Sequence, residues 1–305
     1  MNNALKPEIT TTLFDLGKTI HGFDLDRFFN WLARKFGIPR HYFWDMFSRY
    51  PDGLLYPYEC GQSNQEFVFR FREETKKLLQ ELKEREGKLI VSPEFTPTPE
   101  RNNSKVGDEW SKNSKSREKS YGIESMVWGF TAQEFFDAMN SVWDPEPIGR
   151  ERLELLRKLK GKRYGVYVLS NIGQSQFEYL RGDRHHRVMS PDLCCTNKDL
   201  GDWEHGYRFS RFKEFFESID GFIASCHSNI QCRKMRSSEG TKEECEKIFK
   251  KALAITKSAP EQTVFVDDIL DYINIFRGMG GYGIHCTGNW TKIEHELYQL
   301  GVRWE

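Results

Sequence analysis

The stretch that decides the fold is residues 10–20, which read TTTLFDLGKTI. It opens as a β-branched and apolar run, which is the composition of a buried strand. The run stops at Asp15, and Gly17 then turns the chain. Because open α/β sheets bind ligands at the carboxyl ends of their strands, Asp15 stands where a ligand would lie. Taken alone, the pattern is also that of an ordinary turn former or helix cap.

Three later strand candidates lead into polar residues that can do chemistry. In chain order they are residues 165–169 before Ser170 and Asn171, residues 221–225 upstream of Lys234, and residues 263–266 before Asp267 and Asp268. Amphipathic segments such as residues 150–160 alternate with these runs. Strand–helix alternation predicts a parallel sheet with right-handed crossovers.

The ordered set of Asp, Ser-Asn, Lys and Asp-Asp resembles the haloacid dehalogenase (HAD) superfamily of phosphohydrolases. FDLGKTI followed by Asp24 and Arg27 is similar to the FDLG-type subgroup, which includes glucose-1-phosphatase-like enzymes and is close to the N-terminal phosphatase domain of epoxide hydrolases. The resemblance covers residues 1–25 and 145–290. It implies an α/β fold in which helices sandwich a Rossmann-like parallel sheet, with a helical cap inserted after the first strand.

The predicted core comprises residues 1–22 and 143–305, and the predicted cap comprises residues 23–142. Within the cap, helical spacing at 23–36, 41–50 and 65–86 predicts three helices, the last with Asn64 as its N-cap. Residues 58–63, YECGQS, are similar to an E-x-G-x-x-S/T run in the caps of the subgroup.

Two insertions fall outside the resemblance. Residues 94–121 are rich in Pro, Asn, Ser, Lys and Glu, and this composition predicts a mobile polar loop. Residues 182–207 hold the vicinal pairs His185-His186 and Cys194-Cys195. Vicinal pairs do not match the ligand spacing of known zinc sites, so we expect no metal there.

Composition narrows the class of partner and the compartment. The 305 residues carry 45 Lys plus Arg against 45 Asp plus Glu, which gives no reason to expect a nucleic acid or an acidic membrane as partner. The seven cysteines are odd in number and lack C-x-x-C spacing, as expected of reduced thiols. No apolar leader or membrane-spanning run is visible. We therefore expect a cytoplasmic protein, and the sequence leaves its oligomeric state open.

The resemblance implies a Mg²⁺-dependent phosphatase that hydrolyses a small phosphorylated metabolite through an aspartyl-phosphate intermediate. The implied roles fall on the strand ends already identified. Asp15, Ser170 and Lys234 would be catalytic, Ser170, Asn171 and Lys234 would bind phosphate, and Asp15, Asp268 and the Gly17 carbonyl would hold Mg²⁺ with Asp267 in support through a water.

The chain departs from the family pattern beside the nucleophile. Most HAD phosphatases carry a second Asp, acting as general acid/base, where this chain has Gly17. Since such help is worth ~10²–10⁴-fold, we expect slow turnover or a good leaving group, such as an anomeric phosphate. Asp24 is a candidate substitute from the cap hinge. Lys18, Met235 and Tyr272 also differ from the pattern.

Two alternatives stay open. One is a catalytically weak or inactive HAD-fold protein with a binding or regulatory role, which the missing second Asp favours. The other is a metal-independent dehalogenase-type hydrolase. The Asp267-Asp268 pair argues against the dehalogenase, because adjacent carboxylates after a buried strand repel each other unless a cation or donors offset them.

Overall fold

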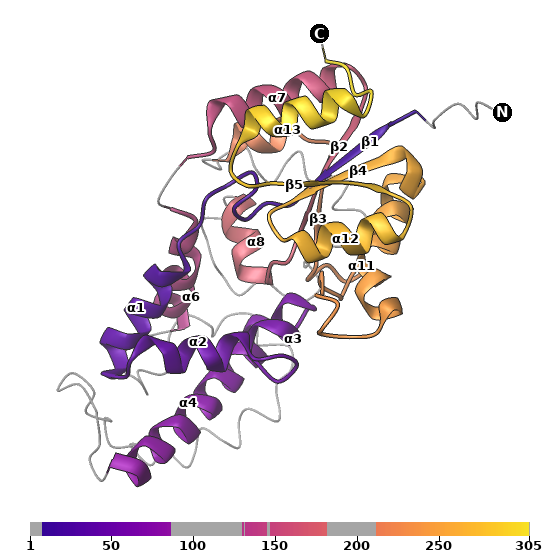
Figure 1. Ribbon diagram of the computed structural model, residues 1–305. Helices are drawn as coiled ribbons and strands as arrows, with labels where there is room; N and C mark the ends of the chain where they lie inside the picture. Colours follow the sequence, from indigo (N-terminus) through magenta and orange to yellow (C-terminus); the bar gives the residue numbers. More distant parts are fainter. Residues whose placement is uncertain (1–7, 87–129, 131, 145–146, 182–211, 305) are drawn as a thin grey trace, which may run out of the picture.

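Five parallel strands form the sheet of the computed structural model, which describes residues 8–86, 130, 132–144, 147–181 and 212–304 (Figure 1). The strands are β1 (Thr11–Phe14), β2 (Gly165–Ser170), β3 (Gly221–Ala224), β4 (Thr263–Asp267) and β5 (Tyr282–His285). Their order in the sheet is β3-β2-β1-β4-β5, and every pairing is parallel. The predicted parallel α/β sheet is confirmed.

The register brings the polar strand ends to one edge. Phe14 lies opposite Val168 of β2 and Val266 of β4, so Asp15 and Asp267 follow at the same level of neighbouring strands. β1 is the central strand, and its four residues are all buried. A buried parallel strand needs apolar side chains on both faces, which explains the run that precedes Asp15.

Helices cover both faces of the sheet, as predicted. One face packs against α7 (Arg150–Gly161), α8 (Gln174–Arg181), α10 (Lys213–Glu217) and α13 (Trp290–Gln299). The other face packs against α11 (Lys242–Thr256) and α12 (Leu270–Gly278), and the short 3₁₀ helix η4 (Pro260–Gln262) leads into β4. Each face has its own apolar cluster, with Phe14 on the first side and Phe265 on the second.

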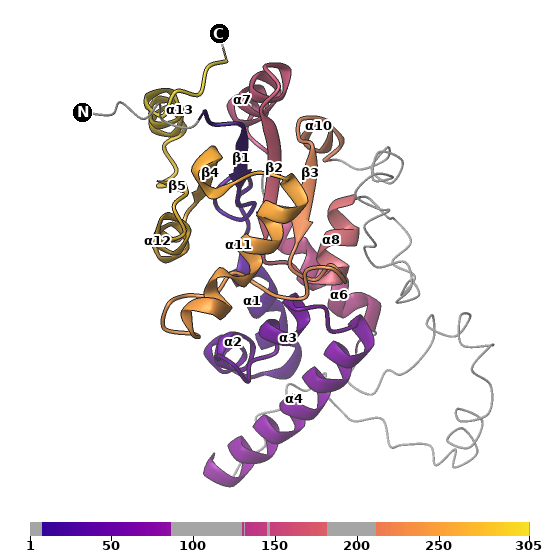
Figure 2. The same ribbon diagram turned by 90° about the vertical axis from the view of Figure 1, so that its right-hand side faces the viewer.

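The remaining helices gather in a separate layer at one end of the molecule, visible in both views (Figures 1 and 2). They are α1 (Leu25–Phe36), α2 (Arg40–Ser48), α3 (Leu55–Glu59), α4 (Asn64–Glu86), α6 (Ala132–Asn140) and the 3₁₀ helix η2 (Ser141–Trp143). Their Phe-rich interior belongs to the same apolar cluster that covers one face of the sheet. The residue boundaries between core and cap stay a prediction.

Two predicted segments lie outside the described residues: the polar loop at 94–121 and the insertion at 182–207 with its His and Cys pairs. Among the helices that the structure describes, none combines the length and apolar character needed to cross a bilayer.

The predicted N-cap of α4 is wrong. Asn64 is the first residue of the helix, and Ser63 is the residue that caps it: the Glu66 peptide N–H donates to Ser63 Oγ at 3.3 Å, and the Ser63 N–H donates to Glu66 Oε2 at 3.1 Å. This reciprocal pair is a capping box. The Asn64 side chain instead accepts a hydrogen bond of 2.8 Å from the Tyr58 hydroxyl.

Tyr58 fixes α3 of the cap against the turn that follows β2. The side chain is fully buried, and its hydroxyl accepts a 2.9 Å hydrogen bond from the Ser175 N–H in the first turn of α8. The ring covers Gly173 so closely that a Cβ on this residue would lie 1.9 Å from a ring carbon. The turn therefore needs glycine for space at this position.

We predict that Gly173→Ala destabilises the protein by roughly 1–3 kcal/mol, because the added methyl group must displace the Tyr58 ring. The measurement is urea unfolding followed by circular dichroism. Gly161→Ala is the control: it ends α7, a Cβ there meets nothing within 4 Å, and alanine favours helix. Equal midpoints for the Gly173→Ala variant and the wild type would show that Tyr58 does not rest on the turn in solution.

Candidate active site

A cavity of about 460 Å³ lies at the carboxyl ends of the strands, between the sheet and the cap helices. The cap contributes mainly apolar and aromatic groups to its wall, among them Leu25, Trp44 and Leu55. It is lined by all seven residues to which the resemblance gives a catalytic, phosphate-binding or metal-binding role: Asp15, Gly17, Ser170, Asn171, Lys234, Asp267 and Asp268. Their roles stay predictions, but the expected convergence is present.

Lys234 is the centre of the site. Its side chain is only 2% exposed, and its Nζ donates to Asp267 Oδ2 at 2.6 Å and to Asp15 Oδ1. Burial works to lower the pKa of Lys234, but the two carboxylates outweigh burial and hold the pKa above its ordinary value. Lys234 is therefore a permanent cation that joins the end of β1 to the end of β4.

Asn171 holds the backbone of this lysine. Its Oδ1 accepts from the Lys234 N–H at 2.6 Å, and its Nδ2 donates to the Lys234 carbonyl at 3.0 Å. The expected phosphate contact of Asn171 stays a prediction, whereas the contact seen here is with the Lys234 peptide group.

The peptide donors after Asn171 are engaged within the protein. The Ile172 N–H donates to Ser225 Oγ at 3.0 Å, and the Gly173 N–H donates to Gln176 Oε1 at 3.2 Å. By contrast, the Ser170 hydroxyl lines the cavity and has no hydrogen-bond partner among the described residues. Ser170 is thus the donor best placed to meet a ligand oxygen.

Three carboxylates meet beside Lys234. Oxygen atoms of Asp15, Asp267 and Asp268 all lie within 4.8 Å of one another. Burial, which outweighs the attraction of Lys234, raises the pKa of Asp15 to about 8, and repulsion from Asp267 adds to the rise. Burial and then repulsion from Asp267 also raise the pKa of Asp268. The cluster carries more negative charge than one lysine neutralises.

This donor set fits a divalent cation of the Mg²⁺ type, which prefers carboxylate and carbonyl oxygens. Asp267 is already occupied: Oδ2 accepts from Lys234, and Oδ1 accepts from the Ile269 N–H at 2.8 Å. Asp15 and Asp268 are therefore the carboxylates best able to hold a cation directly, and the support from Asp267 through a water stays a prediction. Gly17 lines the same cavity, and its carbonyl as a ligand stays a prediction.

The Phe23 ring occupies the space beside Gly17, the position at which the family pattern has a second Asp. A Cβ at Gly17 would lie 2.6 Å from the Phe23 ring, so an aspartate there would have to displace the ring. Asp24, the candidate substitute, is the N-cap of α1, where its side chain accepts from the Arg27 N–H at 3.3 Å. It does not line the cavity in the part of the chain that the structure describes.

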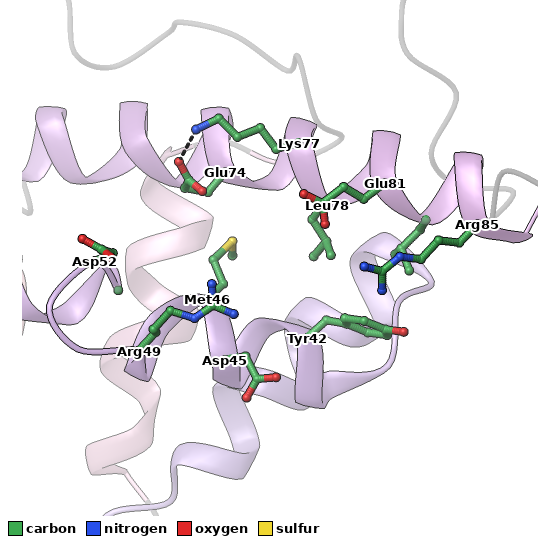
Figure 3. Close-up of a pocket in the computed structure, with 12 residues that line it drawn as sticks. Tyr42, Asp45, Met46, Arg49, Asp52, Glu74, Lys77, Leu78, Glu81 and Arg85 are labelled. Atoms are coloured by element: carbon green, nitrogen blue, oxygen red, sulfur yellow. Dashed lines mark hydrogen bonds and ion pairs between the residues drawn. The ribbon is translucent and has the colours of Figure 1, made fainter.

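A second cavity, of about 340 Å³, lies between α2 and α4 of the cap (Figure 3). Its acidic and basic side chains alternate, and Lys77 is paired with Glu74 of the same helix at 2.7 Å. With charges of both signs interspersed along its wall, it has no evident preference for one ligand charge, and we assign it no role.

Known structures share the fold of this chain. No family model matches it, and no curated protein matches it in sequence. A predicted HAD-like family hydrolase from Porphyromonas gingivalis is 18% identical and aligns over 96% of this chain and 99% of its own, with a TM-score of 0.51.

A HAD family enzyme from Bacteroides thetaiotaomicron is also similar. Its magnesium complex is 17% identical over 94% of this chain and 99% of its own, with a TM-score of 0.52. An aspartate-to-alanine mutant of that enzyme, in complex with magnesium and inorganic phosphate, gives 16% identity over 94% and 98%, with a TM-score of 0.56. At these identities the comparisons establish the HAD-like α/β fold, and the FDLG-type subgroup stays a prediction.

We predict that Lys234→Met lowers the free energy of unfolding by roughly 3–5 kcal/mol in magnesium-free buffer, because Asp15 and Asp267 lose the buried cation that both of them bind. Urea unfolding measures the change. Lys242→Met is the matched control, since Lys242 pairs with Glu246 at 3.7 Å but is 75% exposed. Similar losses for the two variants would contradict the central role of Lys234.

A pH dependence follows from the raised pKa of Asp15. Between its ordinary value of 3.8 and about 8, the folded state keeps a proton that the unfolded state has lost, so stability falls as the pH rises through this window. Asp15→Asn removes the titrating group and keeps an oxygen that accepts from Lys234. Without magnesium, we expect this variant to be more stable than the wild type at pH 8.

The advantage of Asp15→Asn should shrink by up to about 1.4 kcal/mol per pH unit as the pH is lowered toward 5. Other groups titrate in both proteins, so the difference between their unfolding free energies isolates Asp15. A difference that stays constant from pH 5 to pH 8, or that grows on acidification, would show that attraction to Lys234 outweighs burial.

Proposed function

We propose that this protein is a Mg²⁺-dependent hydrolase of phosphoric monoesters that acts on a small phosphorylated metabolite. The observation that carries the proposal is the buried arrangement of Lys234 with Asp15 and Asp267, next to Asp268 and the Ser170 hydroxyl. A nucleophilic carboxylate, a fixed cation and a free hydroxyl donor are the parts that phosphoryl transfer needs.

In the proposed reaction, an oxygen of Asp15 attacks phosphorus and the bond from phosphorus to the leaving oxygen breaks. The product is an aspartyl-phosphate, which water then cleaves to phosphate and free Asp15. Lys234 holds the attacking carboxylate in place and offsets the negative charge that develops on the phosphoryl oxygens. Ser170 would donate to one of those oxygens. Bound Mg²⁺ would offset the repulsion between the phosphate and the carboxylates.

The geometry of the site favours a particular class of leaving group. Gly17 offers no acid to protonate a departing alkoxide, and the Phe23 ring takes the space of such a side chain. Esters with a stable leaving group, such as an anomeric phosphate, therefore suit the site better than phosphates of simple alcohols. The similar enzyme from Bacteroides thetaiotaomicron, solved with magnesium and inorganic phosphate, supports phosphate as the recognised group.

The same Gly17–Phe23 contact favours a second candidate, a metal- and phosphate-binding protein that does not turn over. The carboxylate cluster argues against the dehalogenase, because a metal-free anion site gains nothing from three acidic groups.

The cytoplasm is the compartment we propose. All five described cysteines are free thiols, which supports this proposal: Cys60, Cys226, Cys232, Cys245 and Cys286.

We predict that the protein hydrolyses para-nitrophenyl phosphate, whose leaving group needs no proton, and that chelation of magnesium abolishes the reaction. Release of para-nitrophenolate measures it. Asp15→Asn should reduce the rate at least ~10³-fold, because the nucleophile is lost.

Magnesium binding measured by calorimetry separates the candidates. Binding without turnover across a panel of phosphate esters would favour the binding protein over the phosphatase. Release of halide from a 2-haloacid that survives chelation would favour the dehalogenase.

A further inference from the structure

One ion pair crosses from the cap to the core beside the catalytic lysine. Arg233 Nη1 lies 3.0 Å from Glu59 Oε2 of α3, and the two side chains are 18% and 13% exposed. Apart from the two ion pairs of Lys234, every other described ion pair has a partner more than 30% exposed. Exposed pairs contribute little, whereas breaking a buried pair is costly.

The Arg233 guanidinium contacts both parts of the molecule. On the cap side it pairs with Glu59, and its Cζ lies 5.8 Å from the centroid of the Tyr56 ring. On the core side its Nε donates to the Lys234 carbonyl at 3.2 Å. The same side chain is therefore held by the cap while it holds the backbone of Lys234.

Lys234 is thus fixed at three points. Asn171 binds its N–H and its carbonyl, Arg233 binds its carbonyl, and its Nζ lies between Asp15 and Asp267. We propose that the Glu59–Arg233 pair is a positioning device by which the cap sets the place of Lys234, so that Arg233 and Glu59 are positioning residues for the reaction. Small displacements of a charge from the reacting atoms cost large factors in rate.

This inference rests on the proposed phosphatase activity, and kinetics with para-nitrophenyl phosphate test it. Glu59→Gln keeps the shape of the side chain and removes its charge. Arg233→Lys keeps a charge but replaces the planar fork with one ammonium group, which cannot reproduce the contacts with Glu59 and the Lys234 carbonyl together. We expect kcat to fall by ~10- to 100-fold in each variant while KM changes by less than about threefold.

Glu214→Gln is the matched control. It breaks the 2.9 Å pair between Arg157 of α7 and Glu214 of α10, which also joins two elements but is exposed and does not line the cavity. Its kcat should equal that of the wild type. Unchanged kcat in Glu59→Gln and Arg233→Lys, with only a lower thermal midpoint, would overturn the proposal in favour of a structural pair. A rise in KM alone would overturn it in favour of direct substrate contact.

Hydrogen exchange separates failure of this inference from failure of the proposed function. In magnesium buffer, exchange within residues 231–236 should rise about tenfold in Glu59→Gln and stay unchanged in Glu214→Gln, whether or not the protein hydrolyses esters. If the wild type hydrolyses no ester but the exchange rates of the two variants still differ in this way, the proposed phosphatase activity is ruled out. The coupling between the cap and Lys234 is then still supported. Equal exchange in Glu59→Gln and the wild type would overturn the coupling itself.

Discussion

A buried ammonium group between two carboxylates is the constraint on which this structure depends. Lys234 lies far along the chain from Asp15, and both side chains are removed from water where β1 and β4 end. Buried charges are stable only when they are paired and the remaining donors and acceptors around them are hydrogen-bonded. The surrounding structure supplies both: Asn171 binds the backbone of the lysine, and the Ile269 N–H binds the free oxygen of Asp267.

Parallel pairing makes this arrangement possible. β1 is flanked by β2 and β4 in equivalent register, so three chain segments deliver polar groups to one edge of the sheet without any irregular backbone within the strands. The cap contributes apolar and aromatic groups to the opposite wall of the cavity. Because Asp15, Lys234 and Asp267 are themselves buried, water screens their charges only weakly. The interactions between charges in the site are therefore strong. In the metal-free protein they also lower the stability, because the acidic groups of the cluster outnumber the lysine that neutralises them.

Strand ends were predictable because each is marked by a local change from apolar to polar residues. Asp15, Ser170, Asp267 and Asp268 directly follow such runs, and the parallel pairing of the strands follows from their alternation with helices. The hydrogen-bond and ion-pair partners of individual side chains were less predictable. They depend on packing between segments that are distant in the sequence and that no common sequence pattern links. Asn64 accepts from Tyr58 instead of capping a helix, and Arg233 meets Glu59 across the cap boundary. In the sequence, only the position of Arg233 next to Lys234 and that of Glu59 within the YECGQS run indicated the latter pair.

The apolar cluster that joins the cap to the sheet has an evolutionary consequence. Phe47 and Phe135 in the cap belong to the same cluster as Val168 of β2 and Leu156 of α7. Replacing the cap helices with those of a related protein would therefore require further changes at the interface with the sheet. Without them, the remaining apolar surface would face side chains that do not fit it. Substrate preference in such a lineage would then diverge by point changes along the cavity wall rather than by recombination of whole domains.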